Sequence, residues 1–359
     1  MKKICIKNGN LIQSIAITAP SRVSLVGNPS DLAECIGIGA VLSMPVWGLN
    51  ASVSIQSSDV SYIDAPRSKH ATLADMLSAI KQRGAGDWEL IADTTLKVFG
   101  DMLESVDKEI LNVPVAIHMD TNIPRQRGMS GSSGMIVAFL RALLIMHQLE
   151  NSSKFKPRNL AKWALEVENI LGVHAGLQDR VLQAVSVADS TITALFMDFS
   201  RMVSGNGPKM RETYKQLRNN KLFKAALILS SQPSHSGEVH KPIVAKIKAR
   251  NKQIIDYFTQ LDFLAREAQK AFQHGDWPCL GELMNQNANI RVEIYGQKVL
   301  GALNMALIDA CEKAGCPRNF TGSGGAVVAM LPDGDKSFRR LQQEVENRPE
   351  GKFEIYHIN

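Results

Sequence analysis

Residues 120–134 read D-T-N-I-P-R-Q-R-G-M-S-G-S-S-G and run directly into an apolar stretch, Met135 to Leu149. A loop rich in glycine and serine at a helix start is suited to phosphate, because the first helical N–H groups are unpaired and the helix dipole is positive there. The serine hydroxyls could bind phosphate oxygens or Mg²⁺. The chain holds no G-x-x-x-x-G-K-[ST] sequence, so this is not a Walker-type loop. An N-capped helix with a flexible entry would give the same composition.

A second glycine-rich loop, N-F-T-G-S-G-G at 319–325, stands directly before the apolar run 326–331. By itself it is weak evidence, because a tight turn before a strand often has this composition. Two such loops in one chain favour a nucleotide site, but they do not identify the chemistry.

The hydrophobic periodicity around these loops predicts an α+β protein. Strand-like apolar segments lie at 23–26, 51–56, 113–119, 225–229 and 326–331. Helical spacing is found at 71–83, 88–104, 135–149, 160–171, 241–271 and 280–314. The sequence S-G-N-G-P at 204–208 has the composition of a linker. We therefore expect two lobes, an N-terminal domain at 1–203 that is rich in strands and a C-terminal α/β domain at 204–359.

The composition excludes several classes of protein. The 359 residues are 45% apolar and 21% charged, as in an ordinary globular protein, which excludes a disordered or fibrous chain. No apolar run reaches the ~18 residues of a membrane span. The first residues lack the apolar region of a signal peptide. We expect a cytoplasmic protein without a membrane partner.

The net charge of +6, from 41 basic and 35 acidic residues, leaves two interpretations. The chain could bind a polyanion, or it could be an enzyme for anionic substrates. Basic residues are concentrated at Lys209–Lys224 and Lys241–Lys252. Both runs have helical spacing and few aromatic residues, so we expect no stacking platform for single-stranded nucleic acid. We interpret them as solvated helix faces and expect no nucleic-acid partner.

Three segments resemble the signature motifs of the GHMP kinases, the family of galactokinase, homoserine kinase, mevalonate kinase and phosphomevalonate kinase. They read A-P-S-R-V-S-L-V-G-N-P-S-D at 19–31, I-P-R-Q-R-G-M-S-G-S-S-G at 123–134 and F-T-G-S-G-G-A at 320–326. The resemblance extends over nearly the whole chain. It implies the two-lobed fold of the family, with the active site in the cleft between the lobes, and it implies ATP, Mg²⁺ and a small-molecule acceptor.

Within the family the chain is most similar to the glucuronokinases. The similarity includes D-T-N-I-P-R-Q at 120–126, A-G-L-Q-D-R-V at 175–181 and H-S-G-E-V-H at 235–240. The chain departs from that pattern at 184–195, which is longer and lacks a Tyr-Gly-Gly sequence, and at position 134, which is Gly where Ala is usual. The first departure concerns the acceptor pocket more than the phosphate chemistry.

The resemblance assigns the phosphate chemistry to named residues. It implies that the triphosphate binds the segment made of Pro124, Arg127, Gly128, Met129, Ser130, Gly131, Ser132, Ser133 and Gly134. Ser132, or Ser133 in a shifted register, would offer a hydroxyl to Mg²⁺. Glu168, eleven residues before Asp179, would hold the same ion directly or through water. Asp179 would accept the proton of the acceptor hydroxyl, and Arg22 would lie near it and favour its ionised form. Outside this context, Glu168 would be a solvated helix residue and Asp179 a turn residue.

The acceptor site is expected to involve residues from several segments. Asn28, Ser30 and Asp31 are suited to sugar hydroxyls, although Asp31 could equally be a helix cap. Two arginines that match the glucuronokinase strings, Arg125 and Arg180, would suit a substrate carboxylate. The remaining residues expected to border the acceptor or to close over the phosphates are Ser236, His240, Gly322, Gly324 and Gly325.

These expectations favour an ATP- and Mg²⁺-dependent sugar-1-kinase that converts D-glucuronate to its 1-phosphate. The same chemistry on galactose, arabinose, a heptose phosphate or a mevalonate-type alcohol is the alternative, because sugar kinases change acceptor with few substitutions. A non-catalytic binding or regulatory relative is a third possibility. The expected partners are a nucleotide and a sugar or sugar acid, and the protein is expected to be a monomer or a homodimer.

Overall fold

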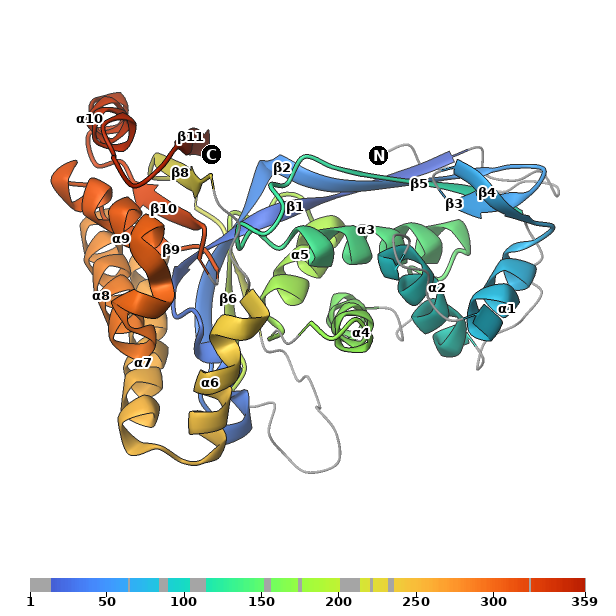
Figure 1. The fold of residues 1–359 in the computed structure, drawn as a ribbon, viewed down its shortest axis with the longest axis horizontal. Coiled ribbons are helices and arrows are strands. Elements are labelled where there is room, and N and C mark those ends of the chain that lie inside the picture. Colours follow the sequence, from blue (N-terminus) through green and yellow to red (C-terminus); the bar gives the residue numbers. More distant parts are fainter. Residues whose placement is uncertain are drawn as a thin grey trace. The chain divides into compact units, whose positions relative to one another are not determined.

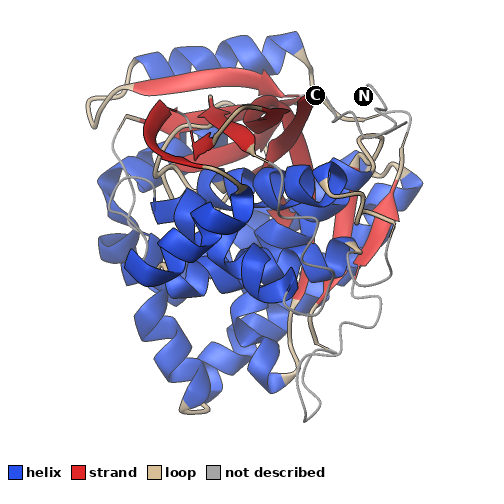
Figure 2. Ribbon diagram, turned by 90° about the vertical axis from the view of Figure 1, so that its right-hand side faces the viewer, coloured by secondary structure: helices blue, strands red, loops and turns tan. Residues whose placement is uncertain are grey.

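The computed structural model describes residues 14–63, 65–83, 90–103, 114–151, 156–173, 176–200, 214–219, 222–231, 236–322 and 324–358. They form a mixed α+β structure, as the sequence predicted (Figures 1 and 2). Contacts divide the chain into two compact units. Unit 1 comprises Met1–Pro20, Leu49–Ile123 and Gly131–Asp189, and unit 2 comprises Ser21–Gly48, Pro124–Ser130 and Ser190–Asn359.

The two units alternate along the chain, whereas the sequence analysis expected one boundary between residues 203 and 204. That position and the expected linker at 204–208 fall in 201–213, outside the described residues. The boundary stays a prediction.

Unit 1 holds the first strands and helices of the chain. Its elements are β1 (Ser14–Val26) and β2 (Ala40–Ser57), each shared with unit 2, then β3 (Ser61–Ile63), β4 (Ala65–His70), α1 (Leu73–Arg83), α2 (Leu90–Leu103), β5 (Val115–Thr121), α3 (Gly131–Met146), α4 (Pro157–Ile170) and α5 (Gln178–Ala188). Helix α5 was not predicted from the sequence.

The alternation of apolar and polar residues explains the unit 1 sheet. Ala51, Val53 and Ile55 of β2 are buried, and the serines between them are half-buried. This part of β2 pairs antiparallel with β5, with Val53 opposite Met119.

Helix α3 is apolar almost all round and packs against α2, α4 and α5. A helix of this kind is held by its neighbours on several sides, which fixes the direction of its first turn.

Unit 2 holds the remaining elements. They are the 3₁₀ helix η1 (Ser30–Ile36), β6 (Ala194–Asp198), β7 (Tyr214–Leu217), β8 (Ala225–Ser230), α6 (Ser236–Lys248), α7 (Lys252–His274), α8 (Trp277–Tyr295), α9 (Gln297–Lys313), β9 (Arg318–Phe320), β10 (Ala326–Met330), α10 (Asp335–Glu346) and β11 (Phe353–Ile358). An antiparallel sheet has the order β11-β8-β10-β9, with Val327 opposite both Ile228 and Phe320. Helices α7, α8 and α9 pack in sequence beside this sheet (Figure 1).

The two long helical stretches expected in unit 2 each divide into two helices, for local reasons. Helix α6 ends before Arg250, which has φ 55°, and the Asn251 side chain caps α7 by accepting a hydrogen bond of 3.1 Å from the Ile254 N–H. Helix α8 ends at Gly296, whose φ of 76° suits glycine.

The two basic runs differ in structure. Lys241–Lys252 follows α6 into its last turn, and Lys246 and Lys248 are exposed there, as expected for a solvated face. The described part of Lys209–Lys224 contains the strand β7, so the expectation of a helix in that run was wrong. Strand β7 pairs with β6, which supplies the backbone partners that favour a strand.

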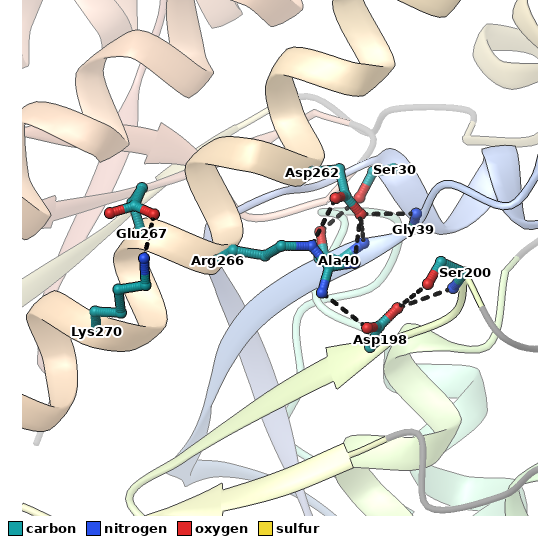
Figure 3. Close-up of polar contacts among 9 residues, drawn as sticks. All are labelled: Ser30, Gly39, Ala40, Asp198, Ser200, Asp262, Arg266, Glu267 and Lys270. Carbon is teal, nitrogen blue, oxygen red and sulfur yellow. Dashed lines mark hydrogen bonds and ion pairs between the residues drawn. The ribbon is translucent and has the colours of Figure 1, made fainter.

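An ionic network ties α7 to two strands within unit 2 (Figure 3). Arg266 donates to Asp198 at the end of β6 over 2.9 Å and to Asp262 over 2.8 Å. Asp262 in turn accepts the backbone N–H groups of Gly39 and Ala40, at 3.1 and 2.8 Å. The hydrogen bond to Asp198 and then that to Asp262 raise the pKa of Arg266. The network fixes the start of β2, and with it the segment that carries η1.

Among the residues that the structure describes, no helix is long and apolar enough to cross a membrane.

Candidate active site

The first turn of α3 carries two of the predicted phosphate-loop serines beside a buried carboxylate. Helix α3 begins at Gly131, and Ser132 and Ser133 follow. Their hydroxyls donate to Oε1 of Glu168 in α4, over 2.9 and 3.0 Å. Glu168 is fully buried, whereas Ser132 is exposed. The structure therefore brings together, within unit 1, the three residues that the resemblance assigned to Mg²⁺.

Arg180 completes this cluster from α5. Its Nη2 forms an ion pair with Oε2 of Glu168, and its Nη1 donates to the Gly176 carbonyl over 2.7 Å. Arg180 is 2% exposed. A carboxylate as buried as Glu168 needs such a partner, because an unpaired charge in the interior costs several kcal/mol. The predicted contact of Arg180 with a substrate carboxylate stays a prediction.

Asp179 precedes Arg180 but is placed differently. Its side chain is 17% exposed, and its Oδ2 lies 3.8 Å from Nη1 of Arg180. Consecutive helical residues point about 100° apart, so one can face the interior of the unit while the next reaches its surface. Asp179 is thus a partly exposed carboxylate next to the buried Glu168–Arg180 pair.

The donor set in unit 1 fits Mg²⁺. This ion prefers oxygen ligands and is usually bound by one or two carboxylates together with substrate phosphates and water. Glu168 and the hydroxyls of Ser132 and Ser133 are such ligands. The described residues contain no group of three or more His, Cys, Asp or Glu side chains that could hold a metal.

The rest of the predicted phosphate loop belongs to unit 2, where it lies against the second glycine-rich loop. Arg22 of β1 donates from Nη1 to the carbonyl of Gly128 over 2.8 Å and to that of Thr321 over 2.5 Å. The hydroxyl of Ser21 donates to the Met129 carbonyl over 2.8 Å. A Cβ on Gly322 would lie 2.4 Å from the Gly128 carbonyl oxygen, so only glycine fits there. The two loops singled out in the sequence therefore meet, and Arg22 binds both.

The loop backbone takes unusual conformations. Gln126, Gly128 and Ser130 all have positive φ, at 56°, 63° and 60°. Such values are uncommon for residues other than glycine and gather at turns and functional sites. Arg127 donates to the Ser231 carbonyl over 2.5 Å, and Arg125 is exposed.

The first motif is held by a buried polar network that the sequence analysis missed. Asn287 of α8 accepts the Gly27 N–H over 2.6 Å and donates to the carbonyl of Asn28 over 3.2 Å. Arg291, one turn further along α8, is bonded to Oδ1 of Asn28 and donates to the Gly322 carbonyl over 2.6 Å. Burial lowers the pKa of Arg291 to about 10. The sequence shows a polar pair four residues apart, but such a pair on a helix is usually solvated, so its burial was not predicted.

Other predicted acceptor residues are also in unit 2. The Ser30 hydroxyl donates to the Ala40 carbonyl over 2.6 Å, and Asp31 is 6% exposed in η1. Nδ1 of His240 lies 2.9 Å from the hydroxyl of Tyr295, whose ring is next to the Arg291 guanidinium. Ser236 begins α6, and its side chain lies outside the described part. Their contact with an acceptor stays a prediction.

Three predicted glycines have local explanations. Gly324 and Gly325 have φ of 129° and 83°, and the Gly325 N–H donates to Asn304 over 2.8 Å. A Cβ on Gly134 would lie 3.1 Å from Nε2 of Gln183 and 3.3 Å from Cβ of Ala51, so the site is tight for the alanine that is usual there. Gln183 donates to the Pro20 carbonyl over 3.1 Å, which holds it in place.

Comparison with known proteins gives a consistent result. The model of the GHMP kinases N terminal domain matches residues 94–186, and that of the GHMP kinases C terminal domain matches 268–347. Glucuronokinase 1 of Arabidopsis thaliana is 30% identical over 345 residues, 94% of this chain and 90% of that protein. Probable glucuronokinase 2 of the same plant is 31% identical over 333 residues, 90% of this chain and 86% of that protein. The structure of Lactococcus lactis galactokinase with galactose has a TM-score of 0.73 at 16% identity, over 98% of this chain and 94% of that chain, which shows a shared fold.

Proposed function

Because the chain belongs to the GHMP kinase family and is a phosphotransferase with an alcohol acceptor, we propose that it is an ATP- and Mg²⁺-dependent sugar-1-kinase that acts on D-glucuronate. The observation that carries the choice of acceptor is the similarity to two plant glucuronokinases over at least 90% of this chain. The unit 1 cluster of Ser132, Ser133, Glu168 and Asp179 supports the choice of reaction.

The reaction needs few covalent steps from the protein. The acceptor hydroxyl oxygen forms a bond to the γ-phosphorus, while the bond from that phosphorus to the β–γ bridging oxygen breaks and its electron pair leaves with ADP. The hydroxyl proton passes to the carboxylate of Asp179. This role is supported by the partial exposure of Asp179, whose side chain is 17% exposed and can be approached by an acceptor hydroxyl.

The phosphate groups are expected to bind the start of α3. Its first N–H groups lack helical partners, and the helix dipole adds a positive potential there. Glu168 and the two serine hydroxyls would hold Mg²⁺, which when bound neutralises charge on the phosphates. Arg22 fixes the carbonyls of Gly128 and Thr321 and so keeps the loop in shape.

The groups proposed to hold the acceptor are Asn28 and Asp31, for the sugar hydroxyls, and Arg125, for the carboxylate. Arg125 is an exposed cation in the loop, which suits a pair with a carboxylate. If Arg125 has this role, Arg125→Gln raises KM for D-glucuronate several-fold and leaves KM for ATP unchanged.

A panel of acceptors with detection of ADP tests the proposal. Purified enzyme with ATP and Mg²⁺ is supplied in turn with D-glucuronate, D-galacturonate, D-glucose, D-galactose, L-arabinose, a heptose phosphate and mevalonate. We expect the highest kcat/KM with D-glucuronate. Turnover of another acceptor with none for D-glucuronate would disprove the choice of acceptor and keep the kinase. No turnover with any acceptor would favour a non-catalytic relative.

A further inference from the structure

We propose that Arg180 is a positioning residue of the metal site: it fixes one oxygen of Glu168, so that the other oxygen is presented to the serine hydroxyls and to Mg²⁺. This inference rests on the proposed use of Mg²⁺–ATP but not on the identity of the acceptor.

The two oxygens of Glu168 have different partners. Oε1 accepts both serine hydroxyls, from Ser132 over 2.9 Å and from Ser133 over 3.0 Å. Oε2 is paired with Arg180. With Oε2 directed at the guanidinium, Oε1 is the oxygen that faces the two serine hydroxyls. Glu168 would therefore present Oε1 towards Mg²⁺, directly or through water, on the side of the exposed Ser132.

Arg180 can hold Glu168 rigidly because its own position is fixed. Its side chain is 3% exposed, and its Nη1 donates to the Gly176 carbonyl over 2.7 Å. Gly176 lies in the segment that connects α4 to α5, and these two helices pack against each other. The planar guanidinium thus ties the connection, the end of α4 and the start of α5 together.

The same side chain lies close to the proposed base. Nη1 of Arg180 is 3.8 Å from Oδ2 of Asp179. Arg180 therefore contacts Glu168 and also lies within ion-pair distance of Asp179. Loss of its charge would leave two neighbouring carboxylates without this cation, and a buried carboxylate without a cation is costly.

A lysine could not do the same. Its ammonium group is a single point on a flexible chain, whereas arginine presents two nitrogens at a fixed separation. Arg180→Lys keeps the charge but loses the simultaneous contact with Glu168 and Gly176. The substitution therefore separates the effect of geometry from the effect of charge.

The experiment measures metal binding directly. Mn²⁺ is titrated into each variant in the presence of the non-hydrolysable nucleotide AMPPNP, and bound Mn²⁺ is followed by electron paramagnetic resonance. We expect Arg180→Gln to weaken Mn²⁺ binding by at least about tenfold and to change the spectrum, as found when supporting residues of metal ligands are removed. Arg180→Lys should lie between this variant and the wild type.

Two controls separate this role from a loss of folding. Arg348→Gln removes another largely buried arginine, which pairs with Asp309 in unit 2, and should leave Mn²⁺ binding unchanged. The second control is a double-mutant cycle with Glu168→Gln. If Arg180 acts through Glu168, then Arg180→Gln adds little to the loss of Mn²⁺ affinity in the Glu168→Gln background.

Other results would overturn the inference. Additive losses in the cycle would show that Arg180 acts independently of Glu168. Wild-type Mn²⁺ binding by Arg180→Gln, with a raised KM for D-glucuronate alone, would assign Arg180 to the substrate carboxylate instead. If D-glucuronate is no substrate but the cycle shows coupling, the proposed acceptor fails and the role of Arg180 stands.

Discussion

Two buried arginines show how the two units use the same side chain differently. Arg180 in unit 1 is 2% exposed and pairs with the carboxylate of Glu168, whereas Arg291 in unit 2 is fully buried and binds the neutral oxygens of Asn28 and Gly322. Arg291 also lies over the rings of Tyr295 and Phe320, at 5.7 and 5.0 Å from their centroids. Arg180 thus places charge next to charge, which suits a metal and a base. Arg291 is instead a cation that holds backbone and amide groups, which suits the shaping of loops.

The largest effect is expected for Asp179 in unit 1. Asp179→Asn removes the proposed base, and kcat should fall by about 1,000-fold, within the range typical of general bases. Steady-state ADP release with D-glucuronate measures it. Asp189→Asn, at the other end of α5, is the matched control and should retain nearly full activity. A loss of less than tenfold in Asp179→Asn would mean that unit 1 does not supply the base.

The second largest effect is expected where the two glycine-rich loops of unit 2 touch, at Gly128 and Gly322. Gly322→Ala places a methyl group 2.4 Å from the Gly128 carbonyl oxygen, so the two glycine-rich loops must separate. A displacement of this size should lower kcat/KM for ATP by roughly 100-fold. Gly48→Ala is the control, because a Cβ there has no atom within 4 Å. Unchanged kinetics in Gly322→Ala would show that contact between the loops is not needed for nucleotide use.

Substitution of Arg291 tests whether the buried polar network around Asn28 contributes to stability. Arg291→Met removes the hydrogen bonds to Oδ1 of Asn28 and to the Gly322 carbonyl and should lower the free energy of unfolding by about 2 kcal/mol, measured by urea denaturation. The methionine variant no longer buries a charge, and the desolvation cost that this avoids partly offsets the loss of the two hydrogen bonds. Arg340→Met, which removes an exposed ion pair with Asp333 and two hydrogen bonds at the surface, should cost clearly less than Arg291→Met. Equal losses in the two variants would contradict the distinction between buried and exposed arginines.

The smallest effect concerns a buried histidine without a charged partner among its described contacts. His147 follows α3 in unit 1 and stacks on Phe99 at 5.8 Å, and burial lowers its pKa to about 4. The unfolded chain, with a histidine pKa near 6.5, binds a proton between these values that the folded chain does not. Stability should therefore fall by about 1 kcal/mol from pH 7.5 to pH 5.5.

His147→Gln should remove that part of the pH dependence, whereas His118→Gln, at a half-buried strand position, should keep it. Urea denaturation at the two pH values provides the comparison. An unchanged slope in His147→Gln would show that His147 is not the titrating group.

The residues of the charged site could be singled out from the sequence, because they sit in recognisable local patterns. A helix directly after the glycine- and serine-rich loop was predicted, although it begins at Gly131 rather than at Met135, and the spacing of Glu168 and Asp179 follows from the motif. The pairing of Arg180 with Glu168 could not be predicted. It depends on how α4 packs against α5, and α5 was not recognised.

The buried polar network of Asn287 and Arg291 was harder to predict, because it depends on contacts between distant parts of the chain. Asn287 and Arg291 are buried by long-range contacts with residues about 260 positions earlier in the chain. A polar residue on a helix is usually solvated, so the pattern of α8 alone gives no reason to bury it. The helix ends at Arg250 and Gly296 were missed because each depends on a single residue with positive φ.

The identity of the product tests the proposed sugar-1-kinase most directly. Enzyme, ATP, Mg²⁺ and D-glucuronate are incubated, and the product is followed by ³¹P and ¹H NMR. We expect one new phosphomonoester coupled to the anomeric proton, formed by the wild type and lost in Asp179→Asn. A phosphate on another carbon, or ADP release without any sugar phosphate, would contradict it.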